Sequence, residues 1–214
     1  MRRASSRRHL TATAAKAGLA FIGRYLLTGL GIVLVFCAPL AATVHDRIGA
    51  VKPPVPVPDV SVVTSDGQRV QLRDLLVGRA SAIQLMFTRC RSTCPIEAAA
   101  FARIQERLAN GQADGIMLLS LSIDPVIDTP EALKAWLERF GARRGWSAAA
   151  PSPTDLATVQ AFFDRTSGLG EDHPTAMYLV DQSGLLVWRT FELPEPDYVA
   201  ELLTALNRPP LPRP

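Results

Sequence analysis

The sequence predicts an α/β sandwich, in which helices flank a central mixed sheet, behind an N-terminal transmembrane helix. Two observations favour the sandwich. A buried-strand pattern runs directly into a helical pattern at residues 82–108, and short hairpin patterns stand on either side of this unit. A third observation favours the transmembrane helix: residues 25–44 contain no charged side chain, and 20 residues are enough to cross a bilayer.

The N-terminal 24 residues are basic. They carry six Lys and Arg side chains and no acidic one. Such flanks stay in the cytoplasm, so the rest of the chain is expected on the extracytoplasmic, periplasmic side of the inner membrane. A cleaved signal peptide and a twin-arginine signal at residues 6–10 are the alternatives. The first lacks well-placed small residues around Pro39 and Leu40, and Lys16 and Arg24 interrupt the second, so an uncleaved anchor is favoured.

The charge after the anchor argues against one class of partner. From residue 45 onward, 17 Lys and Arg stand against 20 Asp and Glu, a net charge of −3, although the whole chain carries +3. A nucleic-acid-binding role therefore loses its main electrostatic support. The remaining length suits one domain of about 150 residues.

The elements are expected in the following order. A proline-rich stretch at residues 51–58 predicts a stiff linker over residues 45–58. A hairpin is expected next, from segments 60–63 and 69–72 on either side of the turn signal Asp66-Gly67. Buried strands follow at 82–87 and 116–123. A second hairpin is expected from segments 175–180 and 185–190, around the turn Asp181 to Gly184.

Helices are expected in four places. One covers residues 96–108, and the others begin at Asp128-Thr129-Pro130, at residues 152–155 and at Pro196. A parallel strand–helix–strand unit followed by an antiparallel hairpin and a covering helix is the order of a thioredoxin-like sandwich. This domain is expected over residues 59–207, with a short tail at 208–214.

Cys90 and Cys94 lie where the strand at 82–87 turns into the helix at 96–108. A helix N-terminus favours thiolates, and Arg89 and Arg91 are expected to act in the same direction. At least one thiol should then have a pKa below the free value of about 8.5. Such a pair suits a soft metal ion or a reversible disulfide. A structural disulfide is the alternative in an oxidising compartment, but across so short a loop it would stabilise little.

His173 is the one histidine of the predicted domain, just before a strand expected beside the dithiol strand. Two thiolates and one imidazole suit copper in both oxidation states, since sulfur favours Cu(I) and imidazole favours Cu(II). Zinc usually has a fourth ligand, and the domain has no further Cys or His to supply it. A surface residue is the alternative interpretation of a histidine near a strand start.

Three separated motifs resemble the Sco/SenC family. They are Phe87-Thr88-Arg89-Cys90 with Cys94-Pro95, then Ser122-Ile123-Asp124-Pro125 with Asp128-Thr129-Pro130, and Asp172-His173 ahead of Tyr178-Leu179-Val180-Asp181. The resemblance spans nearly all of residues 59–206. It implies a membrane-tethered copper protein that helps to assemble the dinuclear copper centre of cytochrome c oxidase subunit II and receives copper from a donor chaperone. It implies Cys90, Cys94 and His173 as copper ligands. Asp124 is either a neighbour of the site or a turn-forming residue before Pro125.

The chain departs from the family in two respects, the residues after the first cysteine and the Pro174-Thr175 pair after the histidine. The family often has Pro and Asp after the first cysteine, where Arg91 and Ser92 stand here, and a cation disfavours an incoming Cu²⁺. Pro174 resembles the cis-proline of thioredoxin-type reductases, although a proline at a strand start is the alternative.

Two functions remain open. In one, the protein delivers copper without catalytic turnover. In the other, it is a thiol–disulfide oxidoreductase in which Cys90 attacks and Cys94 resolves. The three-residue spacer between the cysteines favours copper delivery, because dithiol oxidoreductases usually have two residues there. His173 favours it too, because disulfide exchange does not require a histidine.

Overall fold

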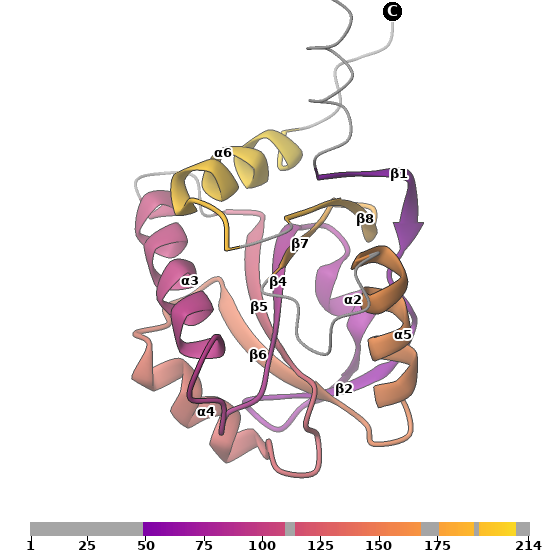
Figure 1. Cartoon of the computed structure of the whole chain (residues 1–214), viewed down its shortest axis with the longest axis vertical. Coiled ribbons are helices and arrows are strands. Elements are labelled where there is room, and N and C mark those ends of the chain that lie inside the picture. Colours follow the sequence, from indigo (N-terminus) through magenta and orange to yellow (C-terminus); the bar gives the residue numbers. More distant parts are fainter. Residues whose placement is uncertain (1–48, 110–113, 168–175, 191–192, 209–214) are drawn as a thin grey trace, which may run out of the picture. The chain divides into compact units, whose positions relative to one another are not determined.

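The computed structural model describes residues 49–109, 114–167, 176–190 and 193–208, which belong to one compact unit, Gly49–Pro214. Its centre is one mixed sheet with the strand order β1-β8-β7-β4-β5-β6-β2-β3 (Figure 1). The strands are β1 (Ala50–Pro56), β2 (Ser61–Thr64), β3 (Arg69–Gln71), β4 (Ala80–Met86), β5 (Ile116–Ser122), β6 (Trp146–Pro151), β7 (Met177–Val180) and β8 (Leu185–Arg189).

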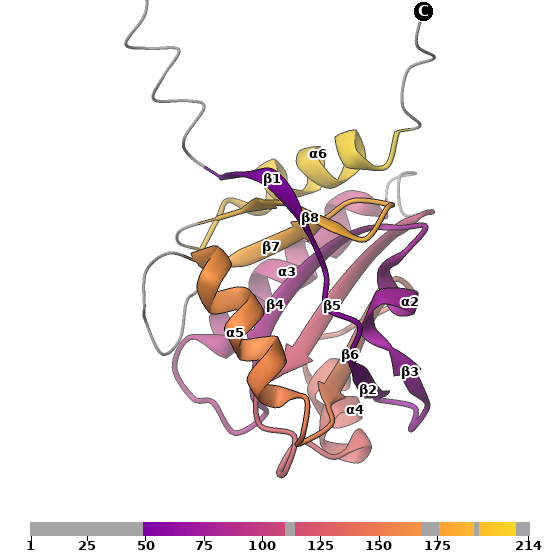
Figure 2. The ribbon, with the colours of Figure 1, turned by 90° about the vertical axis from the view of Figure 1, so that its right-hand side faces the viewer.

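Helices cover both faces of this sheet, as Figure 2 shows with α5 in front of it and α3 behind. The helices are α2 (Leu72–Leu76), α3 (Cys94–Leu108), α4 (Pro130–Arg139), α5 (Leu156–Ser167) and α6 (Pro196–Leu206). On one face, α3, α4 and α6 bury Phe101, Trp136 and Leu203 against the strands. On the other face, α2 and α5 bury Leu76 and Phe163. The predicted mixed sheet between helical layers is confirmed.

Strand β4, which leads into the dithiol, lies near the middle of the sheet. It pairs in parallel with β5 and antiparallel with β7, so the neighbours predicted for it are confirmed. Every residue of β4 and β5 is buried, because helices cover both faces of these strands. The register sets Gln84, near the end of β4, opposite Met177 at the start of β7. The ends of β4 and β5 and the start of β7 therefore meet at one edge of the sheet, the edge where open α/β sheets place their sites.

Both predicted hairpins are present. β2 pairs with β3 and β7 pairs with β8, each antiparallel. Gly67 (φ +81°) and Gly184 (φ +77°) adopt the left-handed backbone that their turns require. The four predicted helices are found as well, and α4 begins as expected: the Thr129 hydroxyl accepts the Ala132 N–H at 3.3 Å.

The expected linker over residues 45–58 is wrong for Ala50–Pro56, which form β1 and pair antiparallel with β8. β1 is an edge strand, so only one of its sides needs backbone donors, and its prolines are tolerated there. Two other elements go beyond the sequence prediction. Helix α2 is too short to show a helical repeat, and the alanines of β6 lack the β-branched pattern of a strand.

Within the described residues, no helix has the length and apolar character needed to span a membrane. The transmembrane stretch predicted at residues 25–44 and the basic residues before it lie outside the described part of the chain.

Candidate dithiol site

The two cysteines stand at the junction of β4 and α3. β4 ends at Met86 and α3 begins at Cys94. The Cys90 N–H donates to the Phe87 carbonyl oxygen at 3.0 Å, which closes a turn between them. Both side chains are almost fully buried, with 6% of Cys90 and 1% of Cys94 exposed, and both are free thiols.

The start of α3 stabilises Cys90 as a thiolate. The Cys94 backbone N–H, in the first turn of the helix, donates to the Cys90 sulfur at 3.4 Å, and the Ser92 hydroxyl lies 3.7 Å from the same sulfur. Burial by itself raises the pKa of Cys90. Hydrogen bonds from the Cys94 thiol, the Ser92 and Cys94 N–H groups and the Ser92 hydroxyl outweigh that effect and lower the pKa from 9.0 to about 6.

Cys94 is the opposite case. Burial raises the pKa of its thiol to about 12, helped by the hydrogen bond with Cys90 and by the negative charges of Cys90 and Glu97. The prediction that at least one thiol has a low pKa is therefore confirmed for Cys90. At neutral pH the pair consists of one thiolate and one thiol, which is the arrangement of an attacking and a resolving sulfur.

The expected contribution of Arg89 and Arg91 is not found. Both side chains are exposed, and the groups that lower the Cys90 pKa belong to Ser92 and Cys94. Water screens an exposed charge, whereas a hydrogen bond acts on the sulfur at contact distance. The helix start, rather than the flanking cations, accounts for the thiolate.

Glu97 is a buried acid one turn after Cys94, and only 2% of it is exposed. Among the residues that the structure describes, none forms a hydrogen bond with its Oε1. Burial raises the pKa of Glu97 to about 8, and the charge of the Cys90 thiolate adds to the shift. The sequence alone suggests only an acid in the first turn of a helix, where such residues are usually exposed.

Asp128 joins the loop after β4 to the end of β5, and it is only 2% exposed. The Thr88 N–H donates to both carboxylate oxygens at 3.1 Å, and the Thr88 hydroxyl donates to Oδ1 at 2.6 Å. The Ser122 hydroxyl donates to Oδ2 at 2.6 Å. Asp124, the acidic residue of this segment that the sequence suggested for the site, forms a turn: its carbonyl oxygen accepts the Ile127 and Asp128 N–H groups at 3.1 and 2.9 Å.

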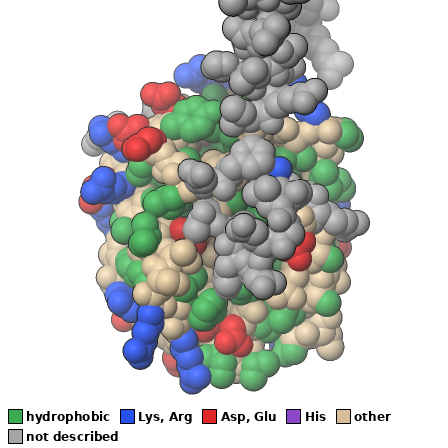
Figure 3. Space-filling view, in the orientation of Figure 1, with side chains coloured by type: hydrophobic (Ala, Val, Ile, Leu, Met, Phe, Trp, Pro, Cys, Tyr) green, Lys and Arg blue, Asp and Glu red, His purple; other side chains and the backbone are tan. Residues whose placement is uncertain are grey.

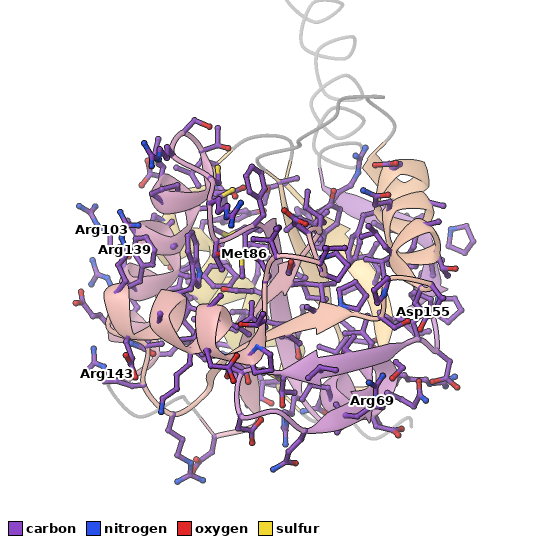
Figure 4. All side chains as sticks on the ribbon, turned by 90° about the horizontal axis from the view of Figure 1, so that it is seen from below. Arg69, Met86, Arg103, Arg139, Arg143 and Asp155 are labelled. Atoms are coloured by element: carbon purple, nitrogen blue, oxygen red, sulfur yellow. The ribbon has the colours of Figure 1, made fainter. Side chains whose placement is uncertain are left out.

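The surface beside the cysteines has an apolar part. Ile96, in the first turn of α3, is 56% exposed, and Val126, in the loop that precedes Asp128, is 75% exposed. Exposed cations stand there too, since Arg89 and Arg91 flank Cys90. Figure 3 shows Lys and Arg side chains at the lower left, and Figure 4 shows Arg103 and Arg139 on the side formed by α3 and α4.

His173 and Pro174 lie outside the described residues, so their predicted roles stay predictions. Within the described residues, no three His, Cys, Asp or Glu side chains are placed to hold a metal ion. Cys90 and Cys94 are the thiols that this part of the chain offers, and soft thiolates fit Cu(I).

Alkylation of the reduced chain is expected to modify Cys90 first, with a midpoint near its pKa of about 6, while Cys94 reacts only in strong alkali. Cys37 is the third cysteine of the chain and is replaced by alanine for this experiment. Mass spectrometry of iodoacetamide-treated peptides, collected against pH in this Cys37→Ala background, measures the reactivity of each thiol. Equal reactivity of the two thiols, or a Cys90 midpoint near the free value of about 8.5, would contradict the assignment.

Comparisons with known proteins agree with this architecture. The SCO1/SenC family model matches residues 56–206. A SCO2-like protein of Rickettsia conorii is 30% identical over 136 residues, which cover 59% of this chain and 64% of that protein, so the chain spans less than two thirds of this relative.

Two solved structures share the fold. One is Arabidopsis thaliana ScoI with copper bound, at a TM-score of 0.58 and 21% identity, covering 75% of this chain and 98% of that one. The other is BsSco, from a study of a disulfide switch in this member of the Sco family of cytochrome c oxidase assembly proteins. It has a TM-score of 0.60 and 20% identity, and the likeness covers 72% of this chain and 95% of that one. A match over 151 residues with a dithiol at the junction of β4 and α3 places the chain in the SCO1/SenC family.

Proposed function

We propose that this protein binds copper through Cys90, Cys94 and His173 and delivers it during assembly of the dinuclear copper centre of cytochrome c oxidase subunit II. The observation that carries the proposal is the Cys90 thiolate, which accepts the first-turn Cys94 N–H at 3.4 Å with the free Cys94 thiol beside it. A copper donor chaperone on one side and subunit II on the other are the proposed partners. An N-terminal membrane anchor at residues 25–44 would keep the domain on the periplasmic side, next to that oxidase.

The chemistry of the two sulfurs supports Cu(I). Thiolate sulfur is a soft ligand, and Cu(I) accepts two sulfurs without further donors. Cys90 is already a thiolate at neutral pH, so only the Cys94 proton must leave when Cu(I) binds both sulfurs. Arabidopsis ScoI, which shares the fold, has been solved with copper bound.

The position of β7 supports His173 as the third ligand. Met177, four residues after His173, pairs with Gln84 at the end of the dithiol strand. Ala176 is buried just before it. β7 therefore begins at the edge of the sheet where Cys90 and Cys94 lie, which supports a copper ligand from the residues that precede this strand in the sequence.

Thiol–disulfide exchange is the second candidate function, and the unequal pKa values of the two cysteines favour it. A thiolate at Cys90 attacks a partner disulfide, and the thiol at Cys94 then resolves the mixed disulfide. BsSco, in which a disulfide switch was identified, has the same fold. In this reading the protein reduces the cysteines of subunit II, or of another periplasmic protein, before copper reaches them.

A transfer experiment separates the two functions. The full chain, loaded with Cu(I), is mixed with the reduced, copper-free soluble domain of subunit II, and copper is then quantified on each protein after separation. Copper delivery predicts that the metal moves to subunit II. If the metal stays on this protein while a disulfide of oxidised subunit II is reduced in a parallel mixture, the oxidoreductase function replaces copper delivery.

A further inference from the structure

The backbone around Cys90 is held by one side chain from a distant part of the sequence. Thr88, two residues before Cys90, gives both its N–H and its hydroxyl to Asp128, forty residues later. The Ser122 hydroxyl, at the end of β5, gives its hydrogen bond to the other carboxylate oxygen and accepts the Asp124 N–H at 3.0 Å. The carboxylate therefore joins the dithiol loop to the loop after the neighbouring parallel strand.

Capping of α4 does not explain this carboxylate. The N-cap of α4 is Thr129, whose own hydroxyl accepts the Ala132 N–H. A carboxylate that is only 2% exposed is costly unless donors satisfy it, and the donors that satisfy this one come from the dithiol loop and from β5. The carboxylate thus lies in the interior on the side of the cysteines.

The consequence for Cys90 follows along the chain. Thr88 lies within the turn that the hydrogen bond from the Cys90 N–H to the Phe87 carbonyl oxygen closes, so the contacts of Thr88 with Asp128 fix this turn. The Cys90 sulfur then lies at 3.4 Å from the Cys94 N–H and 3.7 Å from the Ser92 hydroxyl. These contacts stabilise the reduced form, because a sulfur in a disulfide is a much poorer acceptor than a thiolate.

We infer that Asp128 is a positioning residue, which holds Thr88 and through it keeps the Cys90 sulfur against the start of α3, so that the reduced dithiol is favoured over the disulfide. The inference rests on the proposed function only in taking Cys90 and Cys94 as the reacting pair.

The test is the dithiol–disulfide equilibrium of the full chain in glutathione buffers, in a Cys37→Ala background, without copper. In this reaction the Cys90–Cys94 bond forms as the bond of glutathione disulfide breaks. Two electrons pass to glutathione disulfide, which is reduced to two molecules of glutathione thiol. One takes up the Cys94 proton and the other a proton from water.

Asp128→Asn keeps the shape of the side chain but turns one acceptor oxygen into an NH₂ group that faces donors. The ratio of disulfide to dithiol at a fixed glutathione poise is expected to rise by about threefold or more, because the loop no longer holds the thiolate against its donors. Thr88→Val should shift the ratio in the same direction, and Thr88→Ser, which keeps the hydroxyl, should restore it. The double variant should shift the ratio no further than the larger single change, since both act through one contact.

Asp155→Asn is the matched control. Asp155 also accepts a backbone N–H, from Ser61 at 3.2 Å, and a hydroxyl, from Ser152 at 2.8 Å, but it joins β2 to the start of α5. Figure 4 shows Asp155 beside α5, apart from Met86, where the dithiol strand ends. The control should lose a comparable amount of stability and leave the redox ratio unchanged.

Three outcomes overturn the inference: an unchanged ratio in Asp128→Asn, an equal shift in Asp155→Asn, or additive shifts of Asp128→Asn and Thr88→Val. If Asp128→Asn does not fold, Thr88→Val against Thr88→Ser decides alone. A parent chain that never forms the disulfide in any buffer would overturn the inference together with thiol–disulfide exchange, the second candidate function, and would leave copper delivery standing.

Discussion

His173→Ala is expected to abolish Cu(II) binding while Cu(I) remains on the two sulfurs. Cu(I) is satisfied by two thiolates in a linear arrangement, whereas Cu(II) prefers four ligands in a near-planar set that includes nitrogen. Loss of the imidazole should weaken Cu(II) binding on the order of 100-fold. The parent chain should show an intense sulfur-to-Cu(II) charge-transfer band that is missing in the variant, and competition with a Cu(I) chelator should give nearly equal Cu(I) affinities for both.

His45→Ala is the matched control for this experiment, because His45 stands before the domain and should leave both oxidation states bound. Disulfide exchange with a partner peptide should also be unchanged in His173→Ala, since attack depends on the thiolate fraction and on access. Intact Cu(II) binding together with a collapse of thiol reactivity would remove His173 from the ligand set and leave the oxidoreductase as the better function.

The fold was predictable where the pattern is local. The apolar runs of β4 and β5, the turn glycines Gly67 and Gly184 and the capping residue Thr129 each determine their element within a few positions. β1 is different, because its prolines indicate an extended linker by themselves, and only the free edge of β8 makes this segment a strand. Its pairing joins residues more than a hundred positions apart, which no local pattern can indicate.

The site, like the fold, was predictable where it depends on a local pattern of the sequence. A strand that runs into a helix places Cys90 at a helix start, and the direction of its pKa follows from that alone. The difference between the pKa values of Cys90 and Cys94 requires knowledge of which sulfur is buried more deeply in the protein. Asp128 stands beside a capping threonine in the sequence, so its role in holding Thr88 becomes visible only when β4 and β5 lie side by side.

Glu97→Gln is expected to change how the stability of the domain depends on pH. Burial raises the pKa of Glu97 from 4.5 in the unfolded chain to about 8 in the folded protein. Between these values the folded protein keeps the proton and the unfolded chain has lost it. Unfolding then releases a proton, so the stability falls as the pH rises through this window and has lost the full contribution above pH 8.

Glutamine has the same shape and does not ionise, so the variant lacks this pH dependence. The free energy of unfolding of the variant minus that of the parent should increase by about 1.4 kcal/mol per pH unit, or roughly 3 kcal/mol between pH 5 and pH 7. Urea unfolding of both proteins across this range measures the difference. Glu106→Gln is the control, because Glu106 is exposed on the same helix and should leave the difference near zero at every pH.

The thiolate makes this measurement informative about the site. The Cys90 pKa is lowered to about 6 in the folded protein, so this thiol stabilises the fold progressively as the pH rises from about 6 towards the pKa of a free thiol, about 8.5. Glu97 changes the stability in the opposite direction over much of that range. In the parent protein, which has both groups, the free energy of unfolding should therefore depend less on pH above pH 6 than below it. Because Glu97 is protonated at neutral pH, it adds no second negative charge beside the Cys90 thiolate. If the gap between Glu97→Gln and the parent is independent of pH, Glu97 is ionised in the folded protein, and the dithiol has a charged carboxylate beneath it.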